Sequence, residues 1–161
     1  GRIISMDKKE IKTIQEITEK LLKLLDVEGG FEISESTTNG AESVDIVLNT
    51  KDTGVVIGYH GDTLEGLQLV LSLCVARSLK RFVRISIDAG DYKKNRTEFL
   101  RTLALETKEK VLAEGKEIVV PELKSWERRI VHLLLEKDED VASGSQGEGR
   151  DRVLVVHPKA K

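Results

Sequence analysis

The sequence predicts an α+β fold made of two small domains, and three observations support this. Helical and strand-like patterns alternate along the 161 residues. The first part has the order helix, strand, strand, short helix, helix, strand, and the second part has the order helix, strand, helix, strand, strand. Gly90 stands between the two parts, without an internal repeat or a long low-complexity linker. We therefore expect one domain over residues 1–89 and another over residues 90–161, joined by a stiff helix.

The composition is that of a folded, water-soluble protein. Hydrophobic residues make up 39% of the chain and charged residues 34%. No apolar run approaches the roughly 20 residues that span a membrane, and no signal-peptide pattern is visible. The single Cys74 cannot form an intramolecular disulfide. We therefore expect a cytoplasmic protein without membrane insertion.

The charge distribution argues against a broad basic field. The formal net charge is −2, with 11 basic against 14 acidic residues in 1–89 and 15 against 14 in 90–161. Proteins that hold nucleic acid mainly by long-range attraction carry a strong excess of Lys and Arg. Any contact with nucleic acid must therefore come from local geometry and small basic clusters.

The first domain begins with an amphipathic helix that ends before Gly29-Gly30. Residues 31–33 and 44–48 alternate between apolar and polar, and Asn39-Gly40 between them predicts an antiparallel hairpin. Residues 52–57 read as a short helix. The apolar face of the first helix is expected to contain Ile11, Ile14, Ile17, Leu21, Leu24 and Leu25.

A longer helix follows in this domain. We expect Asp62 or Thr63 to cap it, and Lys80-Arg81 to close it where cations suit the negative end of the helix dipole. Residues 83–87 then alternate as a strand. The buried stripe of the helix is expected to contain Leu64, Leu67, Leu71, Val75 and Leu79, with Cys74 beside them.

The second domain reads as two helices and three strands. Residues 91–114 predict a long helix that Gly115 ends, and Ile118–Val120 is a short strand. Pro121 suits the first turn of a helix that runs to about Glu136. Residues 141–145 and 152–156 predict a second hairpin, joined by residues 146–149.

The segment Gly58-Tyr59-His60-Gly61 is the first candidate site. Two glycines three residues apart let the backbone approach a ligand, and the following helix directs its free N–H groups to the same place. In the KH fold such a turn clamps about four nucleotides of a single strand. His60 could donate to a phosphate, and Tyr59 could stack or hydrogen-bond. A turn that needs glycine only for its backbone angles is the alternative, and the surrounding element order favours the functional interpretation.

The second candidate site lies in the last helix. Arg128 and His132 are four residues apart and share a helix face, where they could contact phosphates or bases. Truncating an exposed Arg128 should weaken binding with little loss of stability. The hairpin loop with Arg150 and Arg152 could add cations, and an ordinary solvated helix face is the alternative. The opposite, buried side is expected to hold Trp126, Ile130, Leu133 and Leu134.

The sequence contains no recognisable pattern of a metal site or of a catalytic site. The spacing of His60, His132 and His157 matches no common zinc site, and the chain has neither a Walker-type loop nor a nucleophile elbow. A nuclease that uses His132 would lack an evident base, acid or metal partner. We therefore expect no enzymatic activity, no metal and no cofactor.

With both segments in view, the chain resembles the bacterial Jag family (SpoIIIJ-associated protein, also called KhpB or EloR). The similarity runs through residues 54–68 around the glycine turn, through Glu127–His132 with the Arg-x-x-x-His signature, and through residues 145–158. It covers nearly the whole chain from about residue 8. Two features depart from the family: Tyr59-His60 stands where Lys or Arg is usual, and the chain has no room for the family's small additional N-terminal domain.

The resemblance implies a type II KH domain over residues 1–89, with its glycine turn at 58–61, followed by an RxxxH domain of helices on a three-stranded sheet. It implies a bacterial protein that binds single-stranded RNA, or single-stranded DNA, and acts as a post-transcriptional regulator linked to cell elongation, division, cell shape and sporulation. It also suggests a small KH-domain partner or a homodimer. The candidate nucleic-acid contacts are Gly58, Tyr59, His60, Gly61, Arg128 and His132, with Arg129, Arg150 and Arg152 as weaker candidates.

A protein-interaction adaptor is the main alternative. The acidic first domain lacks the basic field of a strong RNA clamp, and a KH surface can be reused for dimerisation or for a partner protein. Binding that weakens steeply with salt would favour nucleic acid, whereas a flat salt response would favour the adaptor.

Overall fold

The computed structural model describes residues 6–38 and 40–159, and the chain divides into two compact units. The first unit ends at Lys93 and the second begins at Lys94. This boundary lies in the first turn of helix α4 (Tyr92–Glu114). Each unit contains its own three-stranded sheet and its own hydrophobic core.

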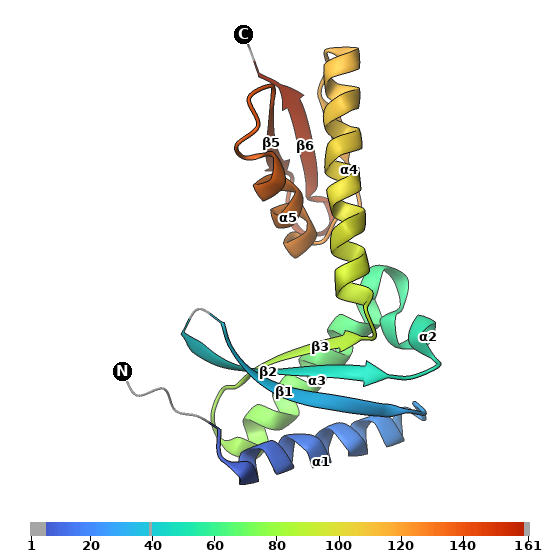
Figure 1. Cartoon of the computed structure of the whole chain (residues 1–161), viewed down its shortest axis with the longest axis vertical. Helices are drawn as coiled ribbons and strands as arrows, with labels where there is room; N and C mark the ends of the chain where they lie inside the picture. Colours follow the sequence, from blue (N-terminus) through green and yellow to red (C-terminus); the bar gives the residue numbers. More distant parts are fainter. Residues whose placement is uncertain (1–5, 39, 160–161) are drawn as a thin grey trace. The chain divides into compact units, whose positions relative to one another are not determined.

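The first unit consists of helices packed on one face of a sheet (Figure 1). Its sheet has the order β1-β2-β3, in which β1 pairs antiparallel with β2 and β2 pairs parallel with β3. The predicted hairpin is confirmed over Gly30–Asn49, although Asn39 of its turn lies outside the described residues. The elements are α1 (Lys8–Leu24), β1 (Gly30–Thr38), β2 (Ala41–Asn49), α2 (Thr53–Ile57), the 3₁₀ turn η1 (Tyr59–Gly61), α3 (Asp62–Leu79) and β3 (Arg84–Ala89).

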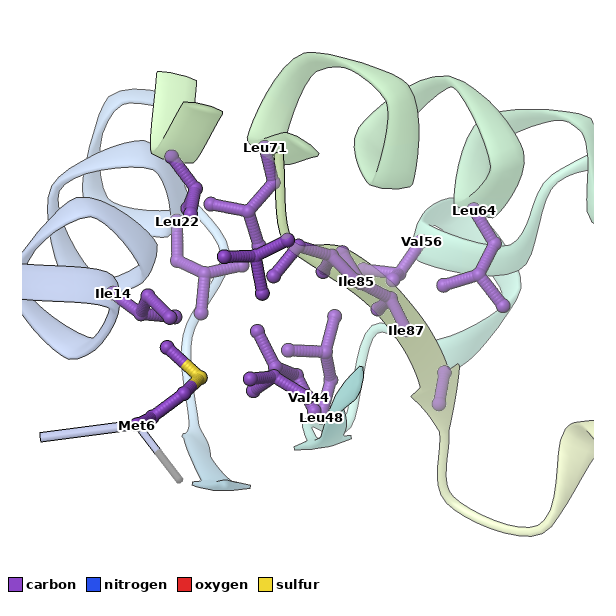
Figure 2. Close-up of a cluster of buried hydrophobic side chains, with 14 residues drawn as sticks. Met6, Ile14, Leu22, Val44, Leu48, Val56, Leu64, Leu71, Ile85 and Ile87 are labelled. Atoms are coloured by element: carbon purple, nitrogen blue, oxygen red, sulfur yellow. The ribbon is translucent and has the colours of Figure 1, made fainter. Parts of the chain in front are cut away.

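The core of the first unit forms because alternate strand residues and one stripe of each helix are apolar. Figure 2 shows Ile14 of α1 and Leu71 of α3 directed towards Val44 of β2 and Ile85 of β3. The prediction that Leu24 and Leu25 complete the apolar face of α1 is wrong, since they are 75% and 53% exposed.

Two further expectations for α3 are corrected by the structure. The N-cap residue is Gly61 in a left-handed conformation, so neither Asp62 nor Thr63 caps the helix; Asp62 is its first residue. Cys74 is exposed rather than part of the buried stripe. Leu64, Leu71 and Val75 are buried as expected, and Leu67 and Leu79 are partly buried.

The second unit packs α4 and α5 (Ser125–Leu135) on a sheet of order β4-β6-β5, in which both pairings are antiparallel. Its strands are β4 (Ile118–Val120), β5 (Val141–Gln146) and β6 (Val153–Pro158), with the 3₁₀ turn η2 (Gly149–Asp151) between the last two. The predicted hairpin is confirmed. Leu100 of α4, Val131 of α5 and Leu154 of β6 belong to one buried cluster.

Helix α5 begins at Ser125 and not at Pro121. The backbone of Lys124 is extended, and its N–H donates to the carboxylate of Glu127 at 2.9 Å. This contact satisfies an N–H just before the first turn, which marks the helix start. Leu123 meanwhile packs into the core. Residues 121–124 are therefore a loop whose apolar residue anchors it, and periodicity alone could not distinguish this from a helical turn.

Candidate nucleic-acid interface

The turn Gly58–Gly61 has a backbone that requires glycine at both ends. Gly58 has φ 70° and ψ −172°, and Gly61 has φ 80° and ψ 15°. A Cβ added at Gly58 would lie 2.1 Å from the Thr63 Oγ1 atom, and one at Gly61 would lie 2.8 Å from the Tyr92 hydroxyl oxygen. Conformation and space therefore both exclude a side chain at these two positions. The turn stands directly before the first turn of α3, which begins at Asp62.

The two residues between the glycines form a stacked pair of rings. The centroids of the Tyr59 and His60 rings are 4.1 Å apart and their planes differ by 9°. His60 adopts a left-handed backbone conformation with φ 48° and ψ 31°, which is uncommon for a residue other than glycine. Tyr59 is 68% exposed. The pair thus presents aromatic surface at the tip of the turn.

The electrostatics of this turn differ from those of a basic clamp. Asp62 and Glu65 lie in the first turn of α3, where their negative charges offset the positive end of the helix dipole. No Lys or Arg occurs between Lys51 and Arg77. This segment itself would therefore offer a phosphate backbone N–H groups rather than a Lys or Arg side chain.

Val55 of α2 is a surface residue that sequence reasoning missed. It is 74% exposed, whereas the neighbouring Val56 is buried at 3%. Val55 lies nearly one helical turn before Gly58, in a helix of five residues. The periodicity of so short a helix does not reveal which of two consecutive valines enters the core.

In the second unit, the prediction that Arg128 lies on the exposed face of its helix is wrong. Arg128 is only 7% exposed. Its Nη1 donates to the carbonyl oxygens of Leu123 at 2.5 Å and Arg152 at 3.2 Å, and its Nη2 donates to the Ser125 hydroxyl at 3.1 Å. The guanidinium therefore joins the β4–α5 loop, the start of α5 and the end of the hairpin loop.

The buried side of α5 also differs from the expected one. Glu127 and Arg128 are buried together with Val131 and Leu135, whereas Leu133 and Leu134 are 53% and 42% exposed. Trp126 and Ile130 are partly buried against the core. The helix is thus rotated relative to the expected arrangement, with two charged side chains facing inward.

A buried ion pair explains why Glu127 can face inward. Its carboxylate is 0% exposed and accepts a hydrogen bond from Arg96 Nε of α4 at 2.6 Å. The second oxygen accepts from the Lys124 N–H. The Arg96 guanidinium lies over the Phe99 ring at 4.7 Å from its centroid. A paired and hydrogen-bonded charge can be buried, and this pair fixes α5 against α4.

His132 and the remaining cations lie at the surface of the second unit. His132 is exposed, and its Nδ1 is 2.9 Å from the Ser143 hydroxyl of β5. Arg129, Arg150 and Arg152 are also exposed. The structure therefore does not present Arg128 and His132 as a joint surface pair. It instead connects Arg128, through the Arg152 carbonyl, to the loop that carries Arg150 and Arg152.

A metal cluster and a membrane-spanning helix are both missing from the part of the chain that the structure describes. Within residues 6–38 and 40–159, no group of three or more His, Cys, Asp or Glu side chains is placed to hold a metal ion. No helix in the same part of the chain is long and apolar enough to cross a membrane.

These features define a class: a protein with two α+β modules, the first carrying the glycine turn of a KH fold. Residues 13–87 match the family model "KhpA/KhpB, KH domain", and residues 98–158 match the model of the domain named for its Arg-x-x-x-His signature, the RxxxH domain. The chain belongs to the Jag/KhpB family, in which a KH domain precedes an RxxxH domain.

Curated relatives are similar along most of this chain. "RNA-binding protein KhpB" of Clostridium symbiosum is 28% identical over 155 residues, which cover 96% of this chain and 67% of that protein. The proteins of the same name from Streptococcus pneumoniae serotype 2 and Bacillus subtilis strain 168 are each 32% identical over 114 residues. These matches cover 71% and 70% of this chain, but only 35% and 55% of those relatives.

Proposed function

We propose that this protein binds single-stranded RNA through both modules and without catalysis. The observation that carries the proposal is the Gly58–Gly61 turn, which is shaped for close approach of a ligand at the start of α3. The names of the relatives support RNA as the ligand. The family resemblance further supports a cytoplasmic, post-transcriptional role linked to cell elongation, division and sporulation.

Within this proposal the second module contacts the strand through its surface groups. His132, Arg129, Arg150 and Arg152 are exposed and can reach phosphates or bases. Arg128 acts indirectly, because its guanidinium is directed at carbonyl oxygens of its own unit. The proposed domains remain residues 1–89 and 90–161, close to the division between the two compact units.

Fluorescence anisotropy with labelled oligonucleotides tests the proposal. Single-stranded RNA, single-stranded DNA and duplexes are titrated with protein over a series of salt concentrations. Saturable binding of single-stranded RNA that weakens with salt is expected. Absence of binding to any oligonucleotide at tens of micromolar protein would contradict the proposal.

The glycine turn is tested by the double variant Gly58→Asp/Gly61→Asp. Two carboxylates would enter the ligand site and strain both backbone positions, so RNA affinity should fall at least tenfold. Circular dichroism must show that the variant remains folded, because both side chains would clash. Gly66→Asp is the control, since it adds a carboxylate to α3 where a Cβ meets nothing within 4 Å. Unchanged affinity in a folded double variant would refute the assignment of the turn.

An adaptor function is the second candidate, and one feature of α3 favours it. Leu69, Val70 and Leu73 are 62%, 45% and 62% exposed, and Cys74 lies on the same side of the helix. Gly66, one turn earlier, would let another helix approach closely. An exposed apolar helix face of this kind commonly marks a protein contact. We propose a second KH unit, from another copy or from a small KH protein, as the partner.

Light scattering coupled to size exclusion tests this second candidate. Wild type should have the mass of a dimer, and Leu73→Glu should shift it to a monomer that circular dichroism shows to be folded. A wild-type monomer at all concentrations would exclude the homodimer. Leu105→Glu, at a similarly exposed leucine of α4, is the matched control and should not change the mass.

A further inference from the structure

We propose that the stacked rings of Tyr59 and His60 form a platform on which an unpaired nucleobase stacks. The inference rests on the proposed function and assigns a specific chemistry to the tip of the glycine turn. The recognised group is the flat face of a base in a single strand, rather than its phosphate.

The geometry of the ring pair supports this role. The rings are nearly parallel, at 9° and 4.1 Å between centroids, so they form one continuous aromatic stack. One face of the Tyr59 ring lies on His60, while 68% of the residue is exposed. A base placed on Tyr59 would extend the stack from two rings to three. Aromatic residues bind successive bases of single strands in this way.

The backbone of the turn holds the pair in place before any ligand binds. The Asp62 N–H donates to the Tyr59 carbonyl, and the Gly61 N–H donates to the Gly58 carbonyl at 3.4 Å. His60 has a left-handed backbone conformation, and its ring stacks on that of Tyr59. A preorganised platform loses less conformational entropy on binding than two mobile side chains would.

The charge of the segment around the turn favours a stacking contact over a contact with phosphate. Asp62 and Glu65 carry negative charge in the first turn of α3, and the nearest Lys and Arg along the chain are Lys51 and Arg77. These two carboxylates oppose a phosphate at the turn, whereas stacking does not require a cation. Because stacking releases few counterions, removing the platform should lower the affinity while leaving the salt slope unchanged.

The experiment measures the affinity of Tyr59→Leu, Tyr59→Phe and Phe82→Leu variants of the full chain for single-stranded RNA. Tyr59→Leu keeps an apolar side chain but removes the aromatic ring, and it should weaken binding about fivefold or more. Tyr59→Phe should bind as wild type does. Phe82, which is 79% exposed, belongs to the same unit but not to the turn, so Phe82→Leu should have no effect.

A second readout reports on the base itself. RNA that contains 2-aminopurine should change its fluorescence on binding wild type and Tyr59→Phe, because stacking quenches this base analogue, and should change less with Tyr59→Leu. A strand with abasic positions keeps its phosphates but loses its bases. The affinity of wild type for the abasic strand should be about as low as the affinity of Tyr59→Leu for the intact strand. The affinities for the intact and the abasic strand should differ less for Tyr59→Leu than for wild type.

The outcomes separate this inference from the proposed function. If wild type binds single-stranded RNA but Tyr59→Leu binds it equally well, the platform is refuted and RNA binding stands. Equal affinity of wild type for intact and abasic strands would also refute the platform alone. Failure of wild type to bind any single strand would overturn both.

Discussion

Buried Arg128 shows how strongly the surroundings of one residue decide its role. Its three hydrogen bonds connect segments that are distant in sequence, from Leu123 to Arg152. Hydrogen bonds to a charged group in a buried site contribute more than neutral bonds at the surface. Arg128, the arginine of the Arg-x-x-x-His signature, therefore stabilises the second module and positions its hairpin loop.

This role predicts a stability defect for Arg128→Ala. Two carbonyl oxygens and a hydroxyl would lose their donor, so the free energy of unfolding should fall by about 2–4 kcal/mol. Urea unfolding followed by the fluorescence of Trp126, the only tryptophan of the chain, measures this directly. The neighbouring Arg129→Ala is the control and should change the stability by less than about 0.5 kcal/mol. A variant of Arg128 as stable as wild type would show that the three bonds contribute little.

The exposed arginines of the second module should affect RNA binding but not the stability of the fold. The variant Arg150→Ala/Arg152→Ala should weaken RNA binding and reduce the salt slope by up to about two, because each cation can contact one phosphate. Its unfolding midpoint should match that of wild type. A steep, unaltered salt slope in this variant would place the phosphate contacts elsewhere.

Between elements, Arg81 joins the start of α1 to the start of β2 in the first unit. Its Nε and Nη2 donate to the Glu10 carboxylate at 2.8 and 3.0 Å, and its Nη1 donates to Glu42 at 3.0 Å. The hydrogen bond from Arg81 is the main cause that lowers the pKa of Glu10 below its ordinary value of 4.5. Because the folded state lowers this pKa, the pair stabilises the fold at and above that value and loses its effect as the pH falls below it.

Arg81→Ala is therefore expected to have a pH-dependent effect. At neutral pH it should lower the free energy of unfolding by roughly 1 kcal/mol, since the pair is partly exposed and screened by solvent. The difference from wild type should shrink as the pH falls below about 4.5. Thermal unfolding monitored by circular dichroism between about pH 3 and pH 7 measures both quantities. Lys12→Ala, which removes a pair that is mostly exposed, should show no such trend.

For the whole molecule, two linked modules predict that affinity depends on strand length. If both modules hold one strand, the second contact is intramolecular and benefits from an effective concentration. A strand long enough to reach both modules should bind at least tenfold more tightly than a strand that fits one. Tyr59→Leu or Arg150→Ala/Arg152→Ala should each remove most of this gain. Equal affinity per site for short and long strands would indicate that the modules act independently.

Much of the element order could be predicted from the sequence, because it depends on local patterns. The hairpin over residues 30–49, the helix that follows the glycine turn and the second hairpin all follow from alternating or helical spacing and from turn residues. The glycine turn itself was recognisable because two glycines three residues apart stand directly before a helix. Its positive φ angles are a local requirement that the residue type already indicates.

Local patterns in the sequence are enough to predict the two α+β units, the position of the glycine turn and the family. The side-chain environments follow from the packing of the folded chain, because burial depends on which neighbours lie against a helix face. Spacing of four residues places Arg128 and His132 on related sides of α5, but only packing against the β4–α5 loop and the hairpin loop buries Arg128, while His132 stays exposed. Likewise, residue type alone specifies neither the left-handed backbone of His60 nor the stack of its ring on Tyr59.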